Sequence, residues 1–78
     1  MNWGVRMDGF ERWYWSAHWG YVWCHLYRHK KTGQWSFGSN ILSANMPEIS
    51  NLKAAKAQVE TRIRLALESS LKHFEVVA

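Results

Sequence analysis

The spacing of the apolar residues changes once along the chain, near residue 46. Before this point, aromatic and β-branched residues alternate with polar ones between turn residues, a pattern typical of β-strands. After it, Ala, Leu, Glu, Lys and Arg recur at helical spacing. The sequence therefore predicts an α+β fold, with an antiparallel β-meander of three or four strands over residues 1–44. One long C-terminal helix over residues 50–75 should pack on one face of this sheet.

Length and composition predict a single domain over residues 1–78. The chain has 78 residues, 47% of them hydrophobic and 15% aromatic, which allows one domain with a thin core. No apolar run reaches the length of a membrane span, and no charged and then apolar leader opens the chain. Because the only cysteine cannot form an internal disulfide, we expect a protein of the reducing cytoplasm that makes no membrane contact.

The predicted helix has an apolar side and a charged side. Its apolar stripe consists of residues at steps of three and four: Leu52, Ala55, Val59, Ile63, Ala66, Leu67, Ser70, Leu71 and Phe74. The charges on the other side alternate in sign every four residues and should lie in water: Lys56, Glu60, Arg64, Glu68 and Lys72. Ser50 is a candidate N-cap, and Asn45 with Glu48 forms a competing capping box. A helix of this length should extend beyond a small sheet.

Two turn signals fix which side chains share a face of the sheet. The segment "KKTG", residues 30–33, predicts a hairpin, and a second turn is predicted at Trp19 and Gly20, or at a wider loop of the same register. The second turn places Ser16 opposite Trp23. Directly opposed residues share a face, and the two hairpins agree about the strand that they have in common.

One face of the predicted sheet is apolar and should lie against the helix. It collects Trp13, Trp15, Ala17, Val22, Cys24, Leu26, Trp35 and Phe37, with Leu26 opposite Phe37. The other face collects Arg12, Tyr14, Ser16, His18, Tyr21, Trp23, His25, Tyr27, His29, Gln34 and Ser36. Only the first face matches the aliphatic stripe of the helix, so we expect the second face to point away from it.

A third turn signal lies near the start of the chain. Asp8 and Gly9 predict a hairpin that pairs Arg6 with Glu11. The resulting edge strand would place four large apolar side chains on the face that points away from the helix: Trp3, Val5, Met7 and Phe10.

The face that points away from the helix is the candidate functional site, because the chain has no second helix to cover it. Exposed apolar patches of more than a few hundred Å² usually mark an interface. The candidate partner-binding residues are Arg12, Tyr14, Tyr21, Trp23, His25, Tyr27 and His29. The candidate phosphate contacts are Arg28, Lys30, Lys31, Lys53 and Lys56.

The sequence favours binding over catalysis. Although "CHLYRH", residues 24–29, gathers metal-ligating residue types, Cys24 should point inward while the histidines point outward. His25 and His29 would lie roughly 13 Å apart along a strand, which is too far to share a metal ion. The same separation argues against a nucleophilic pair of Cys24 and His25, and no glycine-rich loop is suited to phosphate. We therefore expect no catalytic residue, no metal and no cofactor.

Nucleic acid is one candidate partner of the aromatic face. Its rings could stack on bases while nearby Lys and Arg contact phosphates. A sheet closed by a helix that begins "LKAAKAQ", residues 52–58, resembles the second half of double-stranded RNA-binding domains, in which lysines at the start of the last helix touch phosphates. In strand and helix order it also resembles the arm-binding domains of phage integrases.

Protein is the other candidate partner, and the charge distribution favours it. The formal net charge is +4, but residues 1–50 and 51–78 each carry five basic and three acidic residues, so no basic stripe stands out. Tryptophan-rich strands followed by a helix such as "NLKAAKAQVETRI", residues 51–63, are similar in style to small phage-encoded accessory proteins, anti-CRISPR inhibitors among them. This resemblance implies a host protein or nucleoprotein complex as the partner. A homodimer formed through the aromatic face or the end of the helix is the third candidate.

Overall fold

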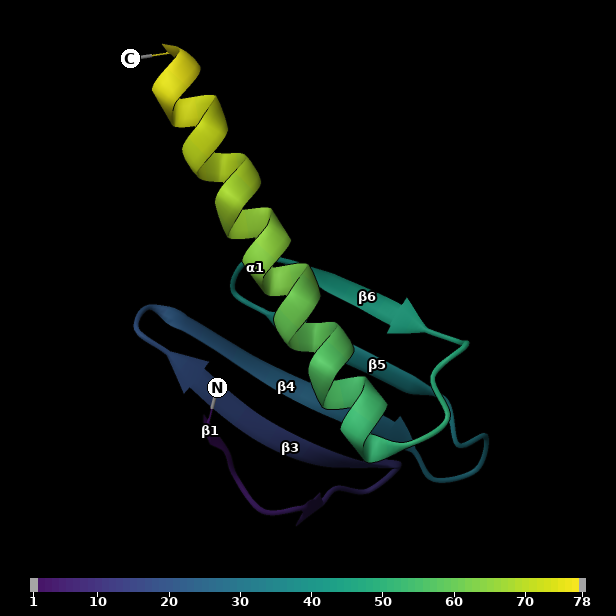
Figure 1. Ribbon diagram of the computed structural model, residues 1–78. Helices are drawn as coiled ribbons and strands as arrows, with labels where there is room; N and C mark the ends of the chain where they lie inside the picture. Colours follow the sequence, from purple (N-terminus) through teal and green to yellow (C-terminus); the bar gives the residue numbers. More distant parts are fainter. Residues whose placement is uncertain (1, 78) are drawn as a thin grey trace.

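The computed structural model describes the backbone of residues 2–77 and the side chains of residues 2–70. It confirms the α+β class: the described residues form one antiparallel open sheet and a helix that lies across one of its faces (Figure 1). The strands are β1 (Asn2–Trp3), β2 (Met7–Asp8), β3 (Arg12–Trp19), β4 (Val22–His29), β5 (Trp35–Ser39) and β6 (Ser43–Met46). The helix is α1 (Leu52–Val77).

The sheet is wider than three or four strands. Strands β3 to β6 form a meander, while β1 and β2 both pair with β3 at the opposite edge. Strand β6 occupies residues that were predicted to lie at the end of the meander and the approach to the helix. Met46 pairs with Trp35 on the face that α1 covers, and it is fully buried. Its burial keeps residues 43–46 extended, so the predicted capping box of Asn45 and Glu48 does not begin the helix.

In the β3–β4 hairpin, each residue of β3 pairs with a residue of β4 two positions later than predicted. Trp19 pairs with Val22, so the central turn residues are Gly20 and Tyr21 rather than Trp19 and Gly20. Gly20 has a φ of 58°, which suits glycine at the first central position of a two-residue hairpin turn. Because side chains alternate with a period of two, this shift changes each residue's partner and leaves its face unchanged.

The predicted core is confirmed in the sheet and in the first half of α1. Ser70 of the predicted apolar stripe is exposed, while Lys56 and Glu60, predicted to lie in water, are half-buried beside Trp3. Trp15 and Trp35 stack at a centroid distance of 5.5 Å beneath the helix. The buried residues of the sheet are Trp15, Ala17, Val22, Cys24, Leu26, Trp35, Phe37 and Met46, and those of the helix are Ala55, Val59 and Ile63. Trp13 is half-buried against this cluster. The predicted pairing of Leu26 with Phe37 is also confirmed.

The N-terminal edge departs from the prediction. Trp3 pairs with Ala17 and Met7 with Tyr14, so four steps along the edge match three steps along β3. Such a bulge adds one residue to the edge, so side chains on its two sides alternate between the faces out of step. Trp3 therefore faces α1, where its Nε1 donates a hydrogen bond to Glu60 at 3.1 Å. Its predicted outward position is wrong, as is the tight pairing of Arg6 with Glu11, because Gly9–Glu11 form a wider loop.

The helix begins one residue later than a Ser50 cap would require. Asn51 is the N-cap, since its Oδ1 accepts a hydrogen bond from the backbone N–H of Ala54 at 2.8 Å. The C-terminal part of α1 extends beyond the sheet, as expected (Figure 1). The side chains of Leu71, Lys72 and Phe74, which were assigned to the two sides of the helix, lie outside the described residues. Among the described residues, no helix is long and apolar enough to cross a membrane.

Candidate functional site

The face of the sheet opposite α1, called the outer face below, carries the predicted site. It presents every second side chain of β3 and β4, and within the described residues no helix covers it (Figure 1). Residues on this face are Arg12, Tyr14, Ser16 and His18 from β3 and Trp23, His25, Tyr27 and His29 from β4. The structure therefore places six of the seven predicted partner-binding residues on one surface, and the seventh, Tyr21, in the adjoining turn.

Four rings on the outer face form an aromatic cluster around His25, consisting of Tyr14, Trp23, His25 and Tyr27. The His25 ring lies 6.0 Å from Tyr14 edge to face, 5.7 Å from Trp23 and 6.1 Å from Tyr27, measured between centroids. Its Nδ1 is also 2.8 Å from the hydroxyl oxygen of Ser16, which opposes it on β3. These contacts fix the orientation of rings that remain open to solvent on one side, and Trp23 is 50% exposed.

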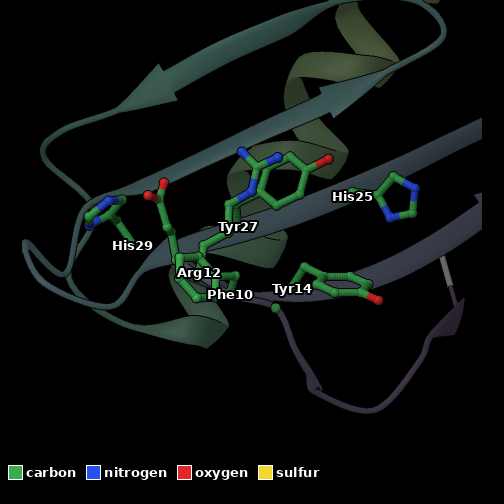
Figure 2. Close-up of a pocket in the computed structure, with 8 residues that line it drawn as sticks. Phe10, Arg12, Tyr14, His25, Tyr27 and His29 are labelled. Carbon is green, nitrogen blue, oxygen red and sulfur yellow. The ribbon is translucent and has the colours of Figure 1, made fainter.

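Arg12 extends the aromatic cluster toward the end of β3. Its guanidinium carbon lies 3.8 Å from the centroid of the Tyr27 ring, which is a close cation–π contact. Figure 2 shows the guanidinium lying across this ring, with Tyr14 and His25 to one side. Within the described residues, Arg12 makes no hydrogen bond through its side chain and no ion pair. The charged group is thus held in place by an aromatic surface while its N–H donors remain available.

A hollow of about 730 Å³ lies beside three members of the aromatic cluster, Tyr14, His25 and Tyr27 (Figure 2). Its lining residues are Gly9, Phe10, Glu11, Arg12, Tyr14, His25, Tyr27 and His29. The loop between β2 and β3 forms one wall, where the Phe10 side chain is 96% exposed. Arg12 and Tyr27 also line a neighbouring hollow of about 460 Å³ over β5 and β6. His25 lines a third hollow, of about 390 Å³, toward β1.

Two of the predicted residues contribute less than their side of the sheet suggested. Tyr21 is 96% exposed in the turn after β3, away from the aromatic cluster. His29 lines the hollow, but its Nδ1 accepts long hydrogen bonds from the backbone N–H groups of Lys31 and Thr32 at 3.3 and 3.4 Å. His29 therefore supports the turn between β4 and β5.

The predicted phosphate contacts do not gather on the outer face. Arg28 points to the α1 side, with its guanidinium carbon 5.3 Å from the Trp35 ring. Lys56 also lies on the α1 side, 5.9 Å from the Trp3 ring. Lys30 forms an ion pair with Asp8, which lowers the pKa of that carboxyl. Lys53 is exposed on α1, and Lys31 is exposed in the β4–β5 turn.

Cys24 and the histidines are separated by the sheet, as predicted. The Cys24 thiol is on the face toward α1 and only 1% exposed, and burial raises its pKa to about 11. His25 and His29 lie on the outer face. Within the described residues, no group of three or more His, Cys, Asp or Glu side chains could hold a metal ion. A buried thiol with a raised pKa is a weak nucleophile.

Comparison with known proteins assigns no function to this chain by similarity. Neither family models, curated protein sequences nor solved structures match this chain. The function must therefore be argued from the geometry of the outer face.

Sequence reasoning missed three contributors to this site. Ser16 was placed on the outer face, but its contact with His25 was not predicted. Phe10 and Glu11 line the largest of the three hollows, and neither was included among the binding residues. The turn signal at Asp8 and Gly9 could have pointed to them, because a loop after an edge strand can fold over the neighbouring face.

Proposed function

We propose that this protein is a non-catalytic binding protein that docks on another protein through its outer face. The observation that carries the proposal is the aromatic cluster with Arg12 stacked on it, held in the middle of a face that no described element covers. Trp, Tyr and Arg are the residue types that contribute most to protein interfaces. Rings already fixed by mutual contacts lose little conformational freedom on binding.

A protein partner fits the outer face better than a nucleic acid does. Binding along a nucleic-acid strand calls for several cations near successive phosphates. On the outer face Arg12 is accompanied mainly by rings, whereas Arg28 and Lys56 lie on the α1 side and Lys30 is paired with Asp8. If the resemblance to phage accessory proteins holds, the partner is a host protein or nucleoprotein complex in the host cytoplasm, and the protein acts as an inhibitor or accessory factor.

The proposal can be tested with a pair of exposed tryptophans. Trp23 is 50% exposed in the aromatic cluster, while Trp19 is 58% exposed and lines a hollow against α1 on the other side of the sheet. We expect Trp23→Ala to remove the partner during affinity purification from nuclease-treated host lysate, and Trp19→Ala to retain it. Equal retention by both variants would contradict the proposal.

Nuclease treatment and mass measurement separate the other two partners. Loss of the captured material after nuclease treatment would show that nucleic acid is the ligand. A wild-type dimer that Trp23→Ala converts to a monomer would show that a second copy covers the outer face. Either result would contradict the proposal that the outer face docks on a different protein.

A further inference from the structure

We propose that Arg12 binds a carboxylate of the protein partner and that the hollow beside it receives an apolar side chain next to that carboxylate. This inference rests on the proposed function and specifies the chemistry of the partner. It makes the partner's docking segment an acidic residue flanked by an aromatic or aliphatic one.

The stacking of Arg12 prepares it for a planar anion. A guanidinium that lies on a ring uses its face for the stacking contact, and its N–H donors point outward around its edge. At 3.8 Å from the Tyr27 centroid, the Arg12 guanidinium is fixed in this way, and no described side chain occupies its donors. Two parallel N–H donors match the two oxygens of a carboxylate. A carboxylate of the partner would therefore accept hydrogen bonds from the Arg12 donors that no described side chain uses.

The size and lining of the hollow indicate which side chain of the partner would lie next to this carboxylate. Its described lining includes Phe10, Tyr14 and Tyr27, and about 730 Å³ is ample for one large side chain. Phe10, in the loop between β2 and β3, is 96% exposed, so its ring is available to contact such a side chain. An apolar group inserted there would lie within reach of the same ring that supports Arg12, so both contacts would form together.

Charge favours a single carboxylate over a run of phosphates. Arg12 is the only Lys or Arg among the described residues that line this hollow, and Glu11 is the only Asp or Glu. Glu11 makes no ion pair with Arg12, so it leaves the guanidinium available. However, its negative charge opposes any anion that approaches. A strand of phosphates would meet this repulsion with one cation to offset it, whereas one carboxylate can bind the fork of Arg12 directly.

The test is a selection of random short peptides displayed on yeast and sorted against the wild-type protein. We expect the selected peptides to share an Asp or Glu beside an aromatic or aliphatic residue. The same selection against Arg12→Gln should lose the acidic position. Arg64→Gln is the matched control, since it removes one exposed positive charge from α1 and should return the wild-type consensus.

Synthetic peptides of the selected sequence then give the size of the effect by calorimetry. We expect Arg12→Gln to weaken binding ~10-fold or more and Arg12→Lys to weaken it less, because lysine keeps the charge but lacks the fork. Arg64→Gln should change the affinity by less than about twofold, as a distant screened charge does. Glu11→Gln should strengthen binding, because it removes a like charge beside the carboxylate. Thermal melting of each variant checks that the fold is retained.

Several results would overturn the inference. These are a selection without enrichment, a consensus without an acid, and equal affinities of Arg12→Gln and Arg64→Gln for the peptide. If the last result occurs while Trp23→Ala still abolishes peptide binding, the outer face remains the docking surface and only the role of Arg12 fails. Salt-sensitive binding of a poly-dT or unstructured RNA oligonucleotide that Arg12→Gln abolishes would overturn both the inference and the proposed function.

Discussion

The two faces of the sheet carry similar aromatic side chains and use them differently. On the face toward α1, Trp15 and Trp35 are 7% and 2% exposed and stack on each other within the core. On the outer face, Trp23 is 50% exposed and contacts His25. Composition cannot tell these tryptophans apart, whereas their parity along the strands can. We conclude that the inner rings stabilise the fold and that the outer rings are available for binding.

The largest expected effect is on the inner face. Trp15→Ala should lower the free energy of unfolding by ~3–5 kcal/mol, because it leaves a large cavity beneath the helix and removes the stacking partner of Trp35. Denaturant titration measures this loss. A loss below about 1 kcal/mol would show that Trp15 is not part of a packed core.

The helix should show the same contrast between neighbouring residues. Ile63 is 1% exposed in the core and Arg64 is exposed to solvent. Ile63→Ala should lower the free energy of unfolding by ~2–5 kcal/mol, and Arg64→Ala by ~0.5 kcal/mol or less. If the two variants lose equal free energy of unfolding in chemical denaturation, the assignment of the α1 face that packs on the sheet is wrong.

Burial of Cys24 should make stability depend on alkaline pH. Burial raises the pKa of this thiol from 9.0 to about 11, so the unfolded chain releases the proton at lower pH than the folded chain does. The stabilising contribution is therefore complete below pH 9 and is lost as pH rises toward 11, by about 2 kcal/mol. Urea titrations between pH 8 and 11 should show this loss in the wild type. In Cys24→Ala the free energy of unfolding should fall over this pH range by about 2 kcal/mol less than in the wild type. An equal fall in both proteins would contradict the burial of the thiol.

The assignment of faces could be predicted from the sequence because it depends only on parity. The error in the β3–β4 turn moved the partner of Ser16 from Trp23 to His25, which lies on the same face two residues away. Trp3 was placed wrongly because a bulge changes parity, and the prediction did not use Gly4, an isolated glycine in this segment that is a signal of a bulge. Strand β6 was missed because a short segment, "SANM", resembles the approach to a helix cap as much as a strand.

The details of the site depend on geometry that a pattern of residues does not contain. Arg12 pairs with His29 and Tyr27 pairs with Tyr14, so the contact between Arg12 and Tyr27 is diagonal across two strands. Diagonal contacts depend on sheet twist and on the rotamers of long side chains. The positions of Phe10 and Glu11 beside the hollow depend on the path of a loop. The sequence could therefore predict which residues share the outer face, but it could not predict the stacked guanidinium.

The most direct test of the contrast between the two faces is the free energy of unfolding of Trp23→Ala, measured with the molecular mass in solution. We expect a monomeric protein in which this substitution costs less than ~1 kcal/mol, while Trp15→Ala costs ~3–5 kcal/mol. The mass matters because loss of a dimer interface would also lower stability, in a concentration-dependent way. If Trp23→Ala unfolds a monomeric protein, the outer aromatic cluster is part of the core, and the proposed binding face is wrong.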